Sequence, residues 1–212
     1  MNHKIIECIP SSALRDYIRN HNVELSVMQE ATIVHEFAKR KKQIALFKML
    51  KDKTESRAEK LLLSTAIMDL KQHPDMEGGY MKDTCEVYCE YFPHEGFPWF
   101  PFLEICNLPV LFKSGDVIRD TRSYELYCVG IGPGNLEFGQ DDFSDECYLC
   151  YPVSWPIREQ HDLALTHSHI NVCEADKPSK ASLDMLTRKQ KKNLRRIRKL
   201  IASDDYELKH FR

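Results

Sequence analysis

Apolar residues recur three and four positions apart through residues 11–72, a stretch without Pro or Gly. Two pairs have the spacing of capping boxes at helix starts: Ser26 with Gln29 and Ser56 with Glu59. The predicted helices begin after Pro10, near Val27, near residue 43 and after Ser56. Residues 4–9 are expected to form a short strand or an extended arm. Residues 1–73 are therefore predicted to be a helical unit.

The pattern changes after residue 73, because all eight Gly lie between positions 78 and 139 and eight of the ten Pro between 74 and 156. Short β-prone runs alternate there with Gly, Pro, Asn and Asp clusters. The predicted strands are Cys85–Phe92, Leu108–Phe112, Asp116–Arg119, Ser123–Ile131, Cys147–Pro152 and Leu163–Val172. Residues 74–176 are therefore expected to be an antiparallel β domain, either a sheet or a small barrel.

Residues 173–180 are expected to be a linker, and a last helix is predicted from about Ser182 to Ala202. Its apolar positions fall on one arc of roughly 120° around Leu194. The opposite half carries eight cations: Arg188, Lys189, Lys191, Lys192, Arg195, Arg196, Arg198 and Lys199. The expected fold class is α+β, with this linker and basic helix forming the segment 177–212.

The formal charge of −2 hides a strong partition along the chain. Residues 1–73 carry 13 basic and 9 acidic side chains, residues 74–176 carry 5 and 19, and residues 177–212 carry 12 and 4. No acid lies between Met185 and Ser203, and each like-charge pair four residues apart costs about 0.2–0.5 kcal/mol on an isolated helix. The basic face is thus expected to bind nucleic acid, or the acidic middle of this chain or of a second copy, or to be solvated.

The middle of the chain has its own candidate binding residues. The acidic run is Asp141, Asp142, Asp145 and Glu146. These carboxylates either imitate a phosphate backbone and occupy a basic channel in a partner, or simply keep a β domain soluble. Six aromatic residues lie within residues 91–102, which form either a loop closing the core or a binding surface anchored by Trp99.

Metal chemistry has one better and one worse candidate. Cys147 and Cys150 have zinc-type spacing, but strand side chains alternate, so the two would point to opposite faces. His167 and His169 share a strand face with Cys173 and form the better trio, although structural Cys and His remain the default interpretation. No catalytic residue and no cofactor is assigned, since the phosphate-cradling Gly loop and the common hydrolase motifs are missing from the sequence.

The eight Cys are expected to be reduced thiols in a cytoplasmic protein, because the sequence shows no signal peptide. No run approaches the ~18 apolar residues of a membrane span, so no membrane partner is expected.

Two stretches resemble small accessory proteins carried by phages and integrative elements of gut Firmicutes. They are Ile9–Ile18 with Leu25–Ile33, and Pro109–Arg119 with Tyr124–Gly132. The Phe112-x-x-Gly-Asp-Val117 entry is similar to SH3-like barrels in that group. The resemblance implies a non-enzymatic protein that binds a protein or nucleoprotein partner, such as an anti-CRISPR-type inhibitor of a defence nuclease. Two alternatives stay open: a DNA- or RNA-binding accessory protein using the basic helix, and a metal-dependent enzyme or zinc-structured domain.

Overall fold

The computed structural model describes residues 3–73, 83–84, 87, 108–133 and 147–203, and the chain divides into two units. Unit 1 comprises Met1–Ile9 and His21–Asn107, and unit 2 comprises Pro10–Asn20 and Leu108–Arg212. This division differs from the expected three segments in two respects. An N-terminal helix belongs with the β strands, and the C-terminal helices belong with them too.

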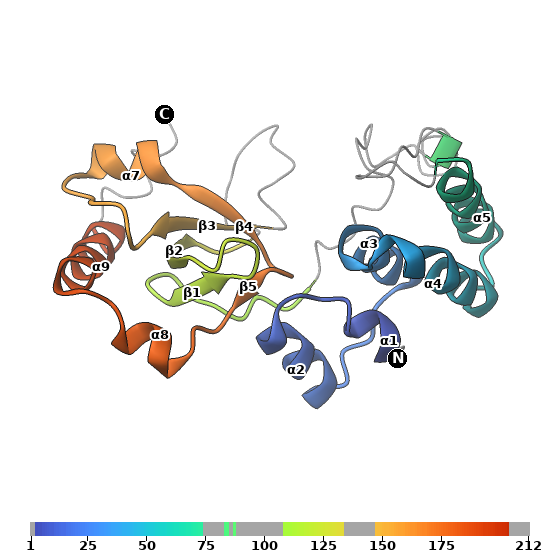
Figure 1. The fold of residues 1–212 in the computed structure, drawn as a ribbon, viewed down its shortest axis with the longest axis horizontal. Helices are drawn as coiled ribbons and strands as arrows, with labels where there is room; N and C mark the ends of the chain where they lie inside the picture. Colours follow the sequence, from blue (N-terminus) through green and yellow to red (C-terminus); the bar gives the residue numbers. More distant parts are fainter. Residues whose placement is uncertain (1–2, 74–82, 85–86, 88–107, 134–146, 204–212) are drawn as a thin grey trace. The chain divides into compact units, whose positions relative to one another are not determined.

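Unit 1 is helical in its described part, as the apolar periodicity predicts (Figure 1). Its helices are α1 (His3–Ile6), α3 (Val27–Phe37), α4 (Arg40–Lys53) and α5 (Arg57–Gln72). Neighbouring helices α3, α4 and α5 pack against one another around fully buried residues such as Phe47, Leu50 and Leu62. The expected strand or arm at residues 4–9 is wrong, because residues 3–6 form helix α1, which packs on α3 and buries Ile5 and Ile6.

The two predicted capping boxes have different outcomes. At α3 the Ser26 hydroxyl accepts from the backbone N–H of Gln29, and the Gln29 side chain accepts in return from the N–H of Ser26. At α5 the Ser56 hydroxyl accepts from the N–H of Glu59, but the Glu59 carboxylate binds the Thr54 hydroxyl instead. Thr54 Oγ1 then accepts from the N–H of Ser56, so the second box is only half formed.

Unit 2 contains a five-stranded antiparallel sheet, which confirms the α+β class. The strands are β1 (Val117–Asp120), β2 (Leu126–Ile131), β3 (Cys147–Pro152), β4 (Ser168–Asn171) and β5 (Ala175–Asp176), in the order β4-β3-β2-β1-β5. Val129 is opposite Cys150 in the register between β2 and β3. Among the described strands, β3 has the predicted bounds, β1 ends one residue later than predicted, and β2 begins later than predicted, after a turn held by Asp120.

Three predictions around the sheet are wrong. Residues 108–112 are not a strand, since the N–H groups of Leu111 and Phe112 donate to the Tyr148 hydroxyl. The expected strand Leu163–Val172 is wrong only in its first half, which belongs to helix α7 (Gln160–Thr166), while its second half is strand β4. Helix α7 starts with a capping box between Glu159 and Asp162. The expected linker at residues 173–180 contains β5, which pairs with β1. The predicted strand Cys85–Phe92 lies outside the described residues, apart from Val87.

Helix α2 (Ser12–Asn20) joins unit 2 through β5, and it confirms the helix predicted after Pro10. The Ser11 hydroxyl donates to the carbonyl of Ala175 at 2.6 Å. The Asp176 carboxylate accepts from the Ser12 hydroxyl and from the N–H of Ala13. These contacts link the first residues of α2 to the strand at the edge of the sheet.

The predicted last helix is two helices, α8 (Lys180–Asp184) and α9 (Arg188–Ile201). The chain is interrupted at Thr187, whose hydroxyl accepts from the N–H of Gln190 while the Gln190 side chain accepts from the N–H of Thr187. A single helix would lose this capping box. None of the helices in the described part of the chain is long and apolar enough to cross a membrane.

Candidate nucleic-acid interface

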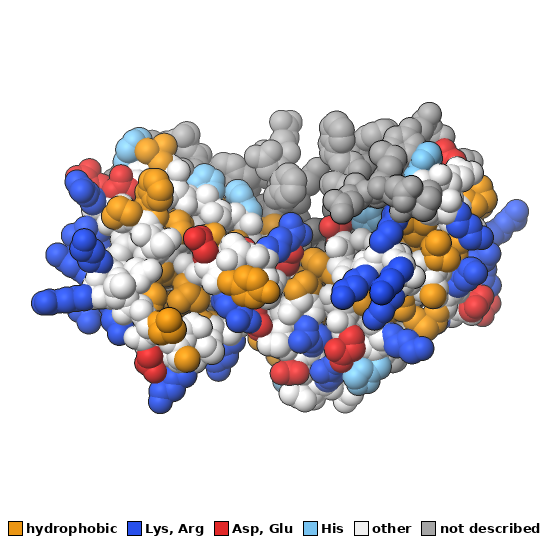
Figure 2. Space-filling view, in the orientation of Figure 1, with side chains coloured by type: hydrophobic (Ala, Val, Ile, Leu, Met, Phe, Trp, Pro, Cys, Tyr) orange, Lys and Arg blue, Asp and Glu red, His pale blue; other side chains and the backbone are white. Residues whose placement is uncertain are grey.

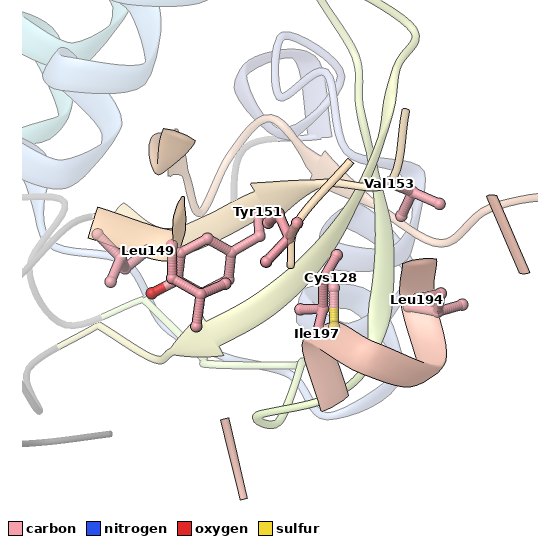
Figure 3. Packing of buried hydrophobic residues seen from close by; sticks show 8 residues of the cluster. Cys128, Leu149, Tyr151, Val153, Leu194 and Ile197 are labelled. Carbon is pink, nitrogen blue, oxygen red and sulfur yellow. The ribbon is translucent and has the colours of Figure 1, made fainter. Parts of the chain in front are cut away.

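Helix α9 is attached to unit 2 by its apolar side. Leu194 and Ile197 are buried in a cluster with residues of β2 and β3, including Cys128 and Tyr151 (Figure 3). The basic opposite side would disfavour this helix on its own, since its first turn places cations at the positive end of the helix dipole. Packing of the apolar stripe, rather than helix propensity, therefore stabilises α9.

All eight predicted cations of α9 are exposed. They follow one another around the helix from Lys191 and Arg198 to Lys189, and Figure 2 shows the Lys and Arg side chains gathered where α9 lies in Figure 1. We call these eight residues the α9 basic face. The sequence pattern thus placed every one of them on the surface.

Two arginines of the α9 basic face also donate hydrogen bonds to backbone carbonyls of neighbouring segments. Arg198 Nε donates to the carbonyl of Gly115 at 2.8 Å, and Arg196 donates to the carbonyl of Ile157 at 3.2 Å. Lys191 Nζ lies 3.5 Å from the carbonyl of Asp184. The groups that these cations contact are neutral carbonyls, so their positive charge is not compensated by these contacts.

Within the described part of the chain, no residue of the α9 basic face forms an ion pair with a carboxylate. The described residues of unit 2 include 16 Lys and Arg but only 9 Asp and Glu. The net charge of these residues is therefore +7. The acidic run Asp141, Asp142, Asp145 and Glu146 lies outside the described residues, as does Trp99.

Several carboxylates of unit 2 are engaged away from α9. Asp176 lies 3.2 Å from Arg119, and Glu174 pairs with Arg122. Burial alone would raise the pKa of Asp176, but hydrogen bonds from the backbone of Ala13 and from the Ser12 hydroxyl outweigh it and lower the pKa below its ordinary value. These acids are thus part of the fold rather than counter-charges for α9.

Besides the bond from Arg196, the loop between β3 and α7 is attached to α9 through the side chain of Asn193. Its Nδ2 donates to the carbonyls of Val153 and Trp155, and its Oδ1 accepts from the N–H of Ile157 at 2.8 Å. Val153 and Ile157 are buried, whereas Trp155 between them is 58% exposed. Trp155 is not among the residues predicted from the sequence, where its position between Ser154 and Pro156 is the only sign of a turn.

A groove of about 680 Å³ runs along the other side of α9. Its walls are largely apolar, with Phe112, Leu186 and Leu194 among them, and Lys191 and Arg198 contribute charge. Asp116 also lines the groove, where its carboxylate accepts from the N–H of Lys113 at 2.8 Å. The groove and the α9 basic face therefore share two cations.

The metal and thiol candidates do not assemble into a site in the described residues. The rings of His167 and His169 lie 5.4 Å apart at their centroids, but no group of three or more His, Cys, Asp or Glu there could hold a metal. Cys128, Cys147, Cys150 and Cys173 are all buried. Burial raises the pKa of Cys128 to about 12, against the opposing charge of Arg198, so this thiol is protonated and unsuited to nucleophilic attack.

Comparisons of the chain with protein-family models, with curated proteins and with solved structures give no match. The interpretation of function therefore depends on the geometry of unit 2.

Proposed function

We propose that this protein binds nucleic acid through the α9 basic face. The observation that carries the proposal is eight exposed cations on one helix without a described carboxylate partner. Like-charge repulsion on such a face is relieved when phosphates approach, and counterion release then favours binding.

The extent of the face favours a polymer over a small anion. Helix α9 has 14 residues, so its cations are spread over about 21 Å and half of the helix circumference. A single phosphate group would reach only two or three of them. A nucleic-acid backbone presents phosphates at intervals along this whole length.

The packing of α9 argues against the other partners of a basic amphipathic helix. A membrane-surface helix or a calmodulin target inserts its apolar side into lipid or into a groove. Here Leu194 and Ile197 on that side are buried in the core of unit 2. The charged side is the exposed side of α9.

Fluorescence anisotropy with a labelled oligonucleotide of about 20 nucleotides tests the proposal. The logarithm of the affinity should fall linearly with the logarithm of salt concentration, with a slope of about −4 to −6 for six to eight phosphate contacts to a single strand. No detectable binding to any oligonucleotide at about 50 mM salt would overturn the proposal.

The decisive variant combines Lys192→Glu, Arg195→Glu and Lys199→Glu, which are exposed and hold no neighbouring backbone. We expect affinity to fall at least about a hundredfold, since three phosphate contacts become repulsive. The matched control carries Lys41→Glu, Lys42→Glu and Lys48→Glu, which change the net charge equally on exposed positions of α4. An equal loss in both variants would mean that α9 is not the binding element.

The anti-defence role implied by the resemblance remains a separate proposal. It uses the acidic run at residues 141–146, outside the described part of the chain. In that role the α9 basic face would contact the guide RNA or the DNA of the inhibited nuclease.

A further inference from the structure

Trp155 is a large aromatic residue that the fold keeps at the surface. Its neighbours in the loop, Val153 and Ile157, are 1% and 0% exposed, whereas Trp155 is 58% exposed. The two buried residues belong to the same core cluster as Leu194 and Ile197 of α9. The exposed position of Trp155 is therefore fixed by buried anchors on both sides.

The backbone around Trp155 is fixed as well. Asn193 binds the loop at three points, and Arg196 donates to the carbonyl of Ile157. The N–H of Trp155 lies 3.4 Å from the carbonyl of Pro152. Little conformational entropy remains to be lost in this loop when a partner packs on it.

Cations of the α9 basic face flank this loop. Two cations lie one turn from Asn193 on the helix surface: Lys189, four positions before it, and Arg196, three positions after it. Because Asn193 binds the carbonyl of Trp155 itself, the backbone at residue 155 is attached to the helix beside these two cations. Proteins that bind single strands combine the same two features, a positive track for the backbone and an aromatic platform for bases.

We propose that Trp155 is a stacking platform for a base of a single-stranded nucleic acid whose phosphates contact Lys189, Arg196 and their neighbours on α9. This inference rests on the proposed function and specifies its substrate class. In a duplex the base faces are stacked on one another, so only an unpaired base offers a face to the indole. Neither contact involves the sugar 2′-hydroxyl, so single-stranded DNA and RNA of the same sequence bind with similar affinity.

The test compares three ligands of equal length: oligo-dT, oligo-U and a DNA duplex. Wild type is expected to bind both single strands more tightly than the duplex. Trp155→Ala should weaken single-strand binding about tenfold and change duplex binding less than twofold. Trp155→Phe should keep most of the affinity because it retains an aromatic face, whereas Trp155→Leu should lose as much as Trp155→Ala.

Fluorescence gives an independent readout, because a stacked base quenches indole emission. The chain has two tryptophans, so quenching by oligo-dT in wild type that is absent in Trp155→Phe assigns the quenching to residue 155. The matched control is Leu165→Ala, which truncates another exposed apolar side chain of unit 2, 70% exposed on α7. This control should bind oligo-dT as wild type does.

The outcomes separate this inference from the proposed function. Equal affinity for single strand and duplex, with no effect of Trp155→Ala, would overturn the inference and leave binding by α9 in place. The absence of binding to all three ligands would overturn both. If Trp155→Ala abolished self-association in sedimentation without changing affinity for oligonucleotides, the residue would belong to a contact between two copies and the inference would be wrong.

Discussion

Asn193 has an unusual position among the residues of α9, because it is the polar residue at the border between the buried and the basic side. Its side-chain amide donates two hydrogen bonds to the loop between β3 and α7 and accepts one from it. An aspartate has nearly the same shape but only acceptor oxygens. The two carbonyls of Val153 and Trp155 would then face a carboxylate without a donor.

We therefore predict that Asn193→Asp destabilises unit 2 by about 1–3 kcal/mol. The loss should equal or exceed that of Asn193→Ala, because the two carbonyls lose their donor and the new carboxylate also repels the carbonyl oxygens. Urea unfolding followed by tryptophan emission measures the difference. Ser203→Ala, which removes a side chain bonded to Gln160 and Leu200 at the end of α9, serves as the control and should change stability by less than about 1 kcal/mol. A stability of Asn193→Asp equal to that of wild type would show that the loop does not depend on this amide.

Among the elements, α9 owes its start to a capping box rather than to favourable charge. The first turn contains Arg188, Lys189 and Lys191 and no acid, so the dipole opposes it. Thr187 and Gln190 satisfy N–H groups at this end. The cap thus compensates locally for the unfavourable charge at this end of the helix.

Thr187→Ala should lower the unfolding free energy by about 1 kcal/mol, a typical cost of removing a cap. Urea denaturation at neutral pH gives the value. Ser179→Ala removes the equivalent hydroxyl from α8, a helix of five residues with no buried side chain, and should cost less. If the two variants were equally stable, the cap of α9 would contribute no more to the unfolding free energy than the cap of α8.

The elements also differ in how well the sequence predicted them. The α9 basic face was predictable because the 3.6-residue repeat is local and Leu194 and Ile197 mark its buried side. Strand β5 was not, since Ala175 and Asp176 stand in a polar stretch and are ordered by residues of α2 more than 160 positions away. Trp155 was missed for the same reason, because its support comes from Asn193, 38 positions later.

At the scale of the whole molecule, unit 2 depends on the ionised carboxylate of Asp176. It accepts from Ser12 and Ala13 of α2, from Arg119 of β1 and from the N–H of Lys177. Its pKa is lowered by hydrogen bonds that outweigh burial, so the folded state binds the proton less readily than the unfolded chain. The resulting stability is present at neutral pH and is lost as the pH falls below the ordinary value of 3.8.

Asp176→Asn should therefore be less stable than wild type at pH 7. The difference in unfolding free energy should shrink at low pH, where the carboxyl of the wild type becomes protonated. Urea unfolding of both proteins at about pH 7, 5 and 3 measures this convergence. A difference that stays constant down to the lowest pH would contradict the role of the charge. Asp184→Asn, at an exposed position of α8, is the matched control for the change in net charge.

The interleaving of the two units along the chain has a consequence for biosynthesis. Ser12 leaves the ribosome 164 residues before its partner Asp176, which corresponds to about 10–30 seconds at common rates of translation. During this interval the helices of unit 1 are synthesised in full, whereas α2 has no sheet edge to bind. The sheet edge that binds α2 is therefore completed only after the described helices of unit 1 have been synthesised.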